Sequence, residues 1–215
     1  MTREQVVVIG ASGFGREALD VLEAMQEAEQ ALRIVGVADD SPSDVNLQRL
    51  ADREVPYLGT VEHVLSHGSP DWSFVIGIGS PQVRRQIARA IENAGRGSFA
   101  AVHPSSTWGA RSSLDAGCVI CAGVVVSTNV RLGRYVHLNP HATIGHDAVL
   151  ADFVSVNPAA VISGEVFVGE GTLVGASATV LQNLHVGEDS LIGAGALVTR
   201  DVPARVVVKG VPGRW

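Results

Sequence analysis

The chain has 215 residues, 46% of them hydrophobic and 18% charged, which is the composition of a globular protein and excludes an intrinsically disordered chain. Its formal net charge is −6 at pH 7, so we expect no nucleic-acid partner. The sequence contains no signal-peptide segment and no apolar run of the roughly 20 residues that span a bilayer. We therefore expect a cytoplasmic protein with no membrane partner.

Residues 1–100 show strands alternating with helices, which is the pattern of a small parallel α/β sheet. The expected elements are strands at 6–10, 34–40 and 73–80 and helices at 15–30, 60–68 and 81–95. Pro81 stands near the first turn of the last helix, where a proline is well tolerated, and Gly95 ends that helix. These features predict a Rossmann-like α/β domain over residues 1–100.

The turn after the first strand reads GASGFG and precedes a helix. Its residues Gly10, Ser12, Gly13 and Gly15 lie at a helix N-terminus, where backbone amides bind phosphate favourably. The spacing G-x-x-G-x-G departs from the dinucleotide fingerprint G-x-G-x-x-G, and 100 residues leave no room for a second nucleotide-binding half. The turn therefore favours a phosphate cradle over an NAD site.

Polar residues follow the next two strands of the predicted sheet. Asp39 and Asp40 come after the second strand, and Gly79 and Ser80 come after the third. Because ligands of open α/β sheets bind outside the carboxyl ends of the strands, these four residues are candidates for substrate contacts. The alternative for the two aspartates is an exposed turn. Arg84 is a candidate phosphate partner or a helix-surface arginine.

After residue 100 the hydrophobic period changes to six. Every sixth position from Val102 to Val198 is apolar, and the residue two before it is usually small or valine. Glycine follows the apolar residue at positions 109, 133, 145, 169, 175, 187 and 193. This repeat is typical of a parallel β-helix with three faces and 18 residues per coil. We expect the aliphatic residues to point inward and the glycines to permit the tight corners.

The two cysteines, Cys118 and Cys121, form a single C-x-x-C inside the repeats. A zinc site needs two more ligands at suitable spacing, and none is near in the sequence. Redox chemistry is the other alternative. We expect both cysteines to serve as small residues of the scaffold.

Repeats such as VGEGTL, VGASAT, VGEDSL and IGAGAL follow a domain that opens with VVIGASGFGREALDVL, and the chain closes with VPARVVVKGVPGRW. In this order the sequence resembles the left-handed β-helix sugar acyltransferases of bacterial glycan pathways. These enzymes acetylate the amino group of nucleotide-linked 4-amino sugars, and close relatives O-acetylate sialic acid. The resemblance implies a left-handed β-helix acyltransferase domain over residues 101–215 and a nucleotide-sugar-binding domain over residues 1–100.

The same resemblance implies acetyl-CoA as co-substrate, no metal, and a homotrimer with active sites between subunits. It also places the pyrophosphate of the nucleotide sugar at the GASGFG turn. Phe14 departs from the family there, because many relatives have a polar residue, often histidine, at that position.

His146 and Asp147 are the residues of most chemical interest in the repeats. A histidine has a pKa suited to accepting a proton near neutrality, and an adjacent carboxylate orients the ring. The alternative is a solvated corner of a repetitive scaffold. The resemblance identifies His146 as the general base and Asp147 as its helper, although the family more often has glutamate at the second position.

The residue 18 positions after His146 is Gly164, which the coil length places one coil above it. The resemblance implies that this backbone N–H stabilises the oxyanion, and the alternative is a simple corner glycine. Asn139 matches a polar residue of the family's acceptor site. His137 and His141 are further candidates for the substrate side.

Acetyl-CoA is expected along the C-terminal coils, where small residues leave a groove and expose backbone. The expected contacts are Gly175, Ala176, Gly193, Ala194 and Lys209. Arg200 and Arg205 are further candidates for the phosphates of the donor.

Three functions therefore stay open. The first is an acetyl-CoA-dependent N-acetyltransferase that acts on a nucleotide-linked 4-amino sugar by direct transfer. The second is an O-acetyltransferase of sialic acid or another sugar. The third is a non-catalytic trimeric module that binds sugar nucleotides.

Overall fold

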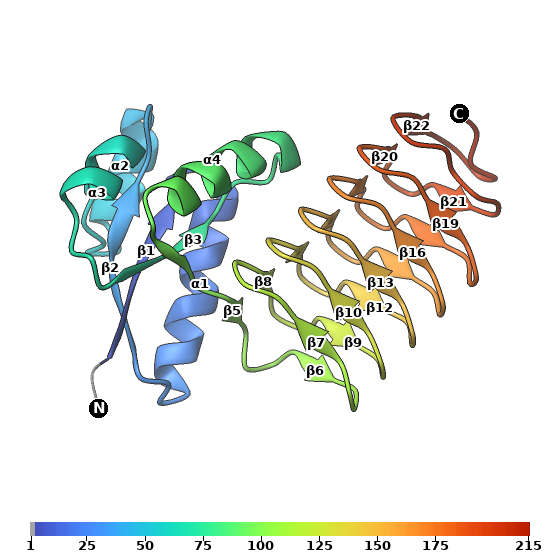
Figure 1. The fold of residues 1–215 in the computed structure, drawn as a ribbon, viewed down its shortest axis with the longest axis horizontal. Helices are drawn as coiled ribbons and strands as arrows, with labels where there is room; N and C mark the ends of the chain where they lie inside the picture. Colours follow the sequence, from blue (N-terminus) through green and yellow to red (C-terminus); the bar gives the residue numbers. More distant parts are fainter. Residues whose placement is uncertain (1–2) are drawn as a thin grey trace. The chain divides into compact units, whose positions relative to one another are not determined.

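The computed structural model describes residues 3–215, so Met1 and Thr2, the first residues of the expected α/β domain, lie outside the described residues. The chain divides into two compact units, with Pro104 the last residue of the first and Ser105–Trp215 forming the second. The first unit holds a sheet with helices, and the second is a stack of short strands (Figure 1).

The first unit contains a four-stranded parallel sheet with the order β2-β1-β3-β4. Its elements are β1 (Glu4–Ile9), α1 (Gly13–Glu27), β2 (Leu32–Ala38), α2 (Asp44–Ala51), α3 (Val61–His67), β3 (Trp72–Ile76), α4 (Pro81–Asn93), β4 (Gly97–Ser98) and β5 (Ala101–Val102). The predicted small α/β fold is confirmed. None of the helices within residues 3–215 combines the length and hydrophobicity needed to cross a bilayer.

The first unit differs from the sequence analysis in two places, a helix that was missed and a strand end that was predicted wrongly. Helix α2 was not predicted, because it has only two turns and buries a single side chain, Leu50, so its apolar period is too weak to recognise. The Ser43 hydroxyl starts this helix by accepting a hydrogen bond from the Asn46 amide. The third strand ends at Ile76 rather than at residue 80, and beyond it only the Gly77 amide still bonds to β1, at Ile9 O.

Close packing explains two glycines of the GASGFG turn. A Cβ at Gly15 would lie 1.8 Å from the Gly10 carbonyl oxygen, and one at Gly10 would lie 2.8 Å from the Gly77 oxygen. Backbone groups occupy these places, so no side-chain movement can relieve the clash. Gly10 also has a φ of +110°, a region that favours glycine.

The second unit consists of two-residue strands stacked at intervals of 18 residues. The strands are β6 (Thr107–Trp108), β7 (Ser113–Leu114), β8 (Val119–Ile120), β9 (Val125–Val126), β10 (Arg131–Leu132), β11 (His137–Leu138), β12 (Thr143–Ile144), β13 (Val149–Leu150), β14 (Ser155–Val156), β15 (Val161–Ile162), β16 (Phe167–Val168), β17 (Leu173–Val174), β18 (Thr179–Val180), β19 (His185–Val186), β20 (Leu191–Ile192), β21 (Leu197–Val198) and β22 (Val207–Val208). They form three parallel sheets, in the orders β7-β10-β13-β16-β19, β8-β11-β14-β17-β20-β22 and β6-β9-β12-β15-β18-β21. The predicted β-helix is confirmed.

The core of the β-helix is the predicted column of aliphatic side chains. From Ile120 to Val198, every inward residue of the repeat is at most 2% exposed. Burying one such side chain stabilises the fold by roughly 1.5–3 kcal/mol. Cys118 and Cys121 are 0% and 2% exposed in this core, and no disulfide joins them.

The corners differ from our expectation. The residue with left-handed backbone is the third after the inward aliphatic, as at Asn129, His141 and Asp147, where φ is 59°, 61° and 60°. Its amide bonds to a carbonyl of the coil below, for example Asp147 N to Thr128 O at 3.0 Å. The glycine directly after the aliphatic has another role: a Cβ at Gly145 would lie 2.5 Å from the Gly164 nitrogen, so this glycine allows successive coils to approach closely.

The last coil is shorter than the others. Ile192 pairs with Val208, and Val186 bridges to Val202, so the interval falls from 18 to 16 residues. The six-residue frame, which predicted the strands as far as Val198, therefore does not continue to the end of the chain.

Candidate active site

The His146–Asp147 pair lies at the corner between β12 and β13. His146 Nδ1 is 2.7 Å from Asp147 Oδ2, and the two side chains are 57% and 45% exposed. When Nδ1 carries the proton that Asp147 accepts, Nε2 of the neutral ring is the acceptor. The pair therefore has the geometry of a base with an orienting carboxylate.

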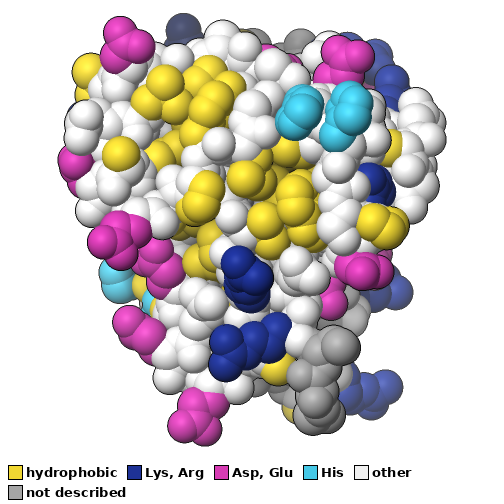
Figure 2. All heavy atoms as spheres, turned by 90° about the vertical axis from the view of Figure 1, so that its left-hand side faces the viewer, with side chains coloured by type: hydrophobic (Ala, Val, Ile, Leu, Met, Phe, Trp, Pro, Cys, Tyr) yellow, Lys and Arg dark blue, Asp and Glu magenta, His cyan; other side chains and the backbone are white. Residues whose placement is uncertain are grey.

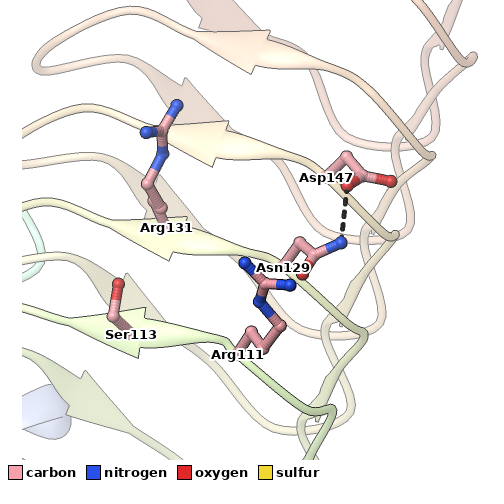
Figure 3. Close-up of a pocket in the computed structure, with 5 residues that line it drawn as sticks. All are labelled: Arg111, Ser113, Asn129, Arg131 and Asp147. Atoms are coloured by element: carbon pink, nitrogen blue, oxygen red, sulfur yellow. Dashed lines mark hydrogen bonds between the residues drawn. The ribbon is translucent and has the colours of Figure 1, made fainter.

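Asn129, one coil below Asp147, is a third member that sequence reasoning missed. Its Nδ2 donates to Asp147 Oδ1 at 2.9 Å, so each carboxylate oxygen has a hydrogen-bond donor (Figure 3). The hydrogen bond with His146, followed by the one with Asn129, holds the pKa of Asp147 below its ordinary value. Asp147 therefore stays ionised, as an orienting carboxylate must, to a lower pH than an ordinary aspartate.

Replacing Asn129 with alanine should raise the pKa of Asp147 toward the ordinary value of about 3.9. A carboxylate with a lowered folded-state pKa stabilises the fold above its unfolded pKa, and this stability is lost as the pH falls through the folded pKa. The variant should therefore melt below the wild type at neutral pH, and under acid conditions the difference should shrink to the backbone cost of alanine at a left-handed corner. Carbon-13 NMR titration of the Asp147 carboxyl measures the pKa directly.

Asn183 provides the matched control for this variant. It occupies the same corner three coils further along, and its φ of 60° equals that of Asn129 to within a degree. Alanine at position 183 reproduces the backbone cost of losing asparagine from a left-handed corner, without touching Asp147. An unchanged Asp147 titration in Asn129→Ala would contradict the assigned hydrogen bond.

Gly164 lies directly over the imidazole. A Cβ at this position would stand 2.5 Å from His146 Nε2, so the ring edge occupies the space that any other residue would need. Gly164 is itself buried, and within residues 3–215 its N–H has no acceptor. The structure thus brings together His146, Asp147 and an available amide, as the 18-residue interval predicted.

A hollow of about 460 Å³ opens below the pair on the outside of the β-helix. Figure 3 shows its five lining residues, which are Arg111, Ser113, Asn129, Arg131 and Asp147. Three of them, at positions 111, 129 and 147, are corner residues of successive coils. Subtracting the same 18-residue interval from position 147 would have identified positions 129 and 111 from the sequence.

The other polar candidates of the repeats do not join His146 within the chain. Asn139 and His141 lie at the preceding corner, between β11 and β12, because six residues advance the chain by one face. Asn139 is 8% exposed, and its Nδ2 donates to Val156 O at 3.1 Å. His137 is buried in β11, level with Ser155 of the next coil.

In the α/β unit, the two aspartates that follow β2 support backbone. Asp39 accepts hydrogen bonds from the amides of Ala11 and Ser41, at 2.8 and 2.9 Å. Asp40 Oδ1 accepts from the Val61 amide at 2.8 Å, at the start of α3. These carboxylates hold the loops in place, so fewer of their lone pairs are available to a nucleotide than we expected.

Only three of the predicted substrate contacts meet in one cavity. A hollow of about 200 Å³ is lined by Ile9, Gly10, Asp39, Asp40, Ser41, Val61, Ile78, Val83 and Ile87. Ser12 and Gly13 are exposed at the start of α1, whereas Gly15 is buried against Gly10. Figure 2 shows the face that lies on the left-hand side of Figure 1, where hydrophobic side chains gather, with acidic groups toward the edge and basic groups below them.

Two residues near the end of β3 act within the loop itself. Gly79 is exposed, and the Ser80 hydroxyl caps α4 by accepting from the Val83 amide at 3.4 Å. Arg84 is fully buried, and its Nη1 bonds to the carbonyl oxygens of Ile78 and Gly79. It therefore holds the loop and is neither a surface residue nor a phosphate partner.

The C-terminal coils support only part of the predicted donor site. The Gly175 backbone is buried, and both Gly175 and Gly193 use their N–H and C=O groups in bonds to neighbouring residues. Ala194 is exposed, and Ala176 is half-buried with its carbonyl accepting a hydrogen bond from Gly195 N. Lys209 is exposed.

The two arginines proposed for the donor have partners of their own. Arg205 forms an ion pair with Glu188, and Arg200 lies over the Trp215 ring, 4.4 Å from its centroid. Neither guanidinium is therefore as available to the phosphates of acetyl-CoA as we expected.

One group of potential metal ligands occurs in the described part of the chain. His146, Asp147 and Glu165 each offer a ligand atom, and these atoms lie within 4.8 Å of one another. All three side chains are exposed, and Glu165 is the corner residue one coil above Asp147. The hydrogen bond between His146 and Asp147 already accounts for two of them, so the geometry needs no ion.

The fold and the site define a hexapeptide-repeat β-helix protein with an exposed His–Asp pair. Sequence profiles agree in both units: the PglD N-terminal domain matches residues 5–91, and the hexapeptide repeat of succinyl-transferase matches residues 165–200. The chain is homologous to left-handed β-helix sugar acyltransferases.

Three individual proteins are similar to this chain. GDP-perosamine N-acetyltransferase of Escherichia coli O157:H7 is 28% identical over 152 residues, which are 67% of this chain and 63% of that protein. PerB from Caulobacter crescentus, solved with CoA and GDP-perosamine, is 26% identical with a TM-score of 0.87, over 98% of this chain and 96% of PerB. The acetyltransferase domain of PglB from Neisseria gonorrhoeae, solved with acetyl coenzyme A, is 26% identical with a TM-score of 0.86, over 99% and 98%.

Proposed function

We propose that this protein is an acetyl-CoA-dependent N-acetyltransferase that acts on a nucleotide-linked 4-amino sugar. One observation carries the proposal: the bonded His146–Asp147 pair lies beneath Gly164, in a chain that matches such enzymes over nearly its whole length. The relatives bind CoA and GDP-perosamine, which supports the choice of both substrates.

The first chemical step is attack of the sugar amine on the thioester carbonyl carbon. His146 Nε2 accepts the proton that the nitrogen loses as the C–N bond forms. Asp147 keeps the other ring nitrogen protonated and stabilises the imidazolium. Asn129 in turn donates a hydrogen bond that orients the Asp147 carboxylate.

The second step is collapse of the tetrahedral intermediate. The Gly164 N–H is available to donate to the oxyanion, which is the role of a backbone amide held close to the base. The C–S bond then breaks, and the imidazolium returns its proton to the departing thiolate. The products are the acetamido sugar and CoA, so no residue needs to carry the acyl group.

The two substrates approach from different parts of the chain. We place the nucleotide at the carboxyl ends of the α/β strands, with Gly10, Asp39 and Asp40 around their shared hollow. We place the acetyl donor along the C-terminal coils, where Ala194 is exposed and Ala176 is half-buried.

We also propose the homotrimer, with each active site covered by a neighbouring β-helix. The catalytic pair is half exposed in a single chain, whereas acyl transfer benefits from excluding water. Large apolar side chains on the outside of the β-helix, such as Phe167 and Leu191, are about two-fifths exposed and would be covered by assembly. Sedimentation equilibrium should give the mass of three chains, and a monomer at assay concentrations would reject this arrangement.

A substrate panel tests the reaction. We expect purified protein to release CoA thiol from acetyl-CoA with GDP- or UDP-linked 4-amino sugars, and mass spectrometry should locate the acetyl group on nitrogen. Free 4-amino sugar and sialic acid are the comparison substrates. Acetylation of a hydroxyl of sialic acid alone would replace this function with O-acetylation, and no thiol release with any acceptor would leave a binding module.

A further inference from the structure

Two arginines on the outside of the β-helix line the hollow that ends at Asp147. Arg111 is the corner residue before β7, and Arg131 belongs to β10, level with Ser113 of the coil below. Figure 3 shows both guanidinium groups among the side chains that line this hollow of about 460 Å³. Ser113 adds a hydroxyl that can donate a hydrogen bond.

Neither guanidinium has an acidic partner within residues 3–215. Elsewhere on the β-helix, Arg134 lies 2.9 Å from Asp152, and Arg205 pairs with Glu188. Exposed arginines of this β-helix thus take carboxylate partners where one is near, and the two in the hollow have none. Their charges are available to an anion.

The one acidic residue of the hollow is Asp147, and its carboxylate is already engaged. Its two oxygens accept from His146 and Asn129, so this negative charge faces its own donors at the upper end of the hollow. Two positive charges and one bonded carboxylate leave the hollow with a net positive charge. A guanidinium fork fits phosphate oxygens well, because it offers paired N–H donors.

Along the β-helix, the two arginines and the proposed donor groove lie on opposite sides of His146. Gly164 and the proposed donor groove lie on the coils after His146, whereas Arg111 and Arg131 lie on the coils before it. When the sugar amine lies at His146, the diphosphate of the acceptor can reach the two arginines if the nucleotide extends toward the lower coils. The Arg16 guanidinium, beside the GASGFG turn, is occupied by Ala11 O and Asn46 Oδ1.

We propose that Arg111 and Arg131 form a diphosphate-binding site that holds the acceptor, a nucleoside-diphosphate-linked amino sugar, against the catalytic pair. The inference rests on the proposed function and adds its specificity determinant.

The test is the double variant Arg111→Gln/Arg131→Gln. The KM for the nucleotide-linked amino sugar should rise roughly tenfold to a hundredfold, the effect of losing charge-assisted hydrogen bonds. The KM for acetyl-CoA should stay within about twofold of the wild type, since the donor lies on other coils. Calorimetric titration with GDP and UDP as probes should show the same loss of affinity without any need for turnover.

Arg33→Gln is the control, because this exposed arginine stands at the amino end of β2, opposite the carboxyl end of the strand where the nucleotide contacts of the α/β unit are proposed. It removes one arginine charge, where the double variant removes two, and should leave both KM values unchanged. A double variant that raises the KM for acetyl-CoA but not for the acceptor would overturn the proposal, as would one that changes neither. Wild-type protein that binds GDP through the arginines but releases no thiol would reject acetyl transfer and keep the diphosphate site.

Discussion

Replacing His146 with alanine is expected to lower kcat by about 10²–10⁴-fold, the usual contribution of a general base. The amine must lose a proton as it bonds to the thioester carbon, and His146 Nε2 is the acceptor that the bond to Asp147 leaves available. Methyl in place of imidazole removes that acceptor, and water must then take the proton. Steady-state rates of thiol release at saturating substrates measure the loss.

The same change should leave the fold intact. The His146 side chain is 57% exposed and contributes little buried surface, so the melting temperature and the sedimentation mass should match the wild type. His67→Ala, which removes an exposed histidine from α3, is the control for nonspecific effects. A His146→Ala enzyme within about threefold of the wild-type kcat would exclude this residue as the base.

Gly164→Ala is expected to have the second largest effect, a fall in kcat of about 10²–10³-fold. The added methyl would stand 2.5 Å from His146 Nε2, which is closer than non-bonded atoms approach. The exposed imidazole can rotate away from the added methyl, so relieving this clash should change the free energy of unfolding only slightly. The proton acceptor is then displaced, and the methyl crowds the approach to the Gly164 amide.

Gly169→Ala is the contrasting variant. A Cβ there would lie 2.5 Å from the Glu188 backbone nitrogen, which cannot move without separating two coils. We therefore expect Gly169→Ala to lower the melting temperature strongly, whereas Gly164→Ala should melt near the wild type and be nearly inactive. If Gly164→Ala kept its activity, the imidazole would not need to lie under this glycine during catalysis.

Local periodicity explains why so much of the fold could be predicted. The inward aliphatics recur every six residues because three flat faces make one coil, so the positions from Ile120 to Val198 could be assigned to the core before any coordinates. Gly164 over His146 follows from the same arithmetic. Helix α2 escaped prediction because one buried leucine makes no period.

Side-chain pairing across coils was harder to predict, since the repeat specifies which residues stack but not which of them bond. Asn129 lies under Asp147 by the same interval, yet only the coordinates show its amide turned toward the carboxylate. The role of the glycines was misassigned for a similar reason. A glycine in a repeat is compatible with a left-handed corner or with close coil packing, and the backbone angles decide between them.

The amino-acid sequence by itself determined the two architectures, the 18-residue coil and the identity of the His–Asp pair, because period and adjacency are properties of the chain. The tertiary structure alone decided which charged groups are already engaged. It showed Arg84 buried in its own loop and Asp39 and Asp40 bonded to backbone amides. It also showed that, among the described residues 3–215, Arg111 and Arg131 have no acidic partner around one hollow. Whether a charge is neutralised depends on distances of a few ångströms between residues far apart in sequence, and only the folded coils set those distances.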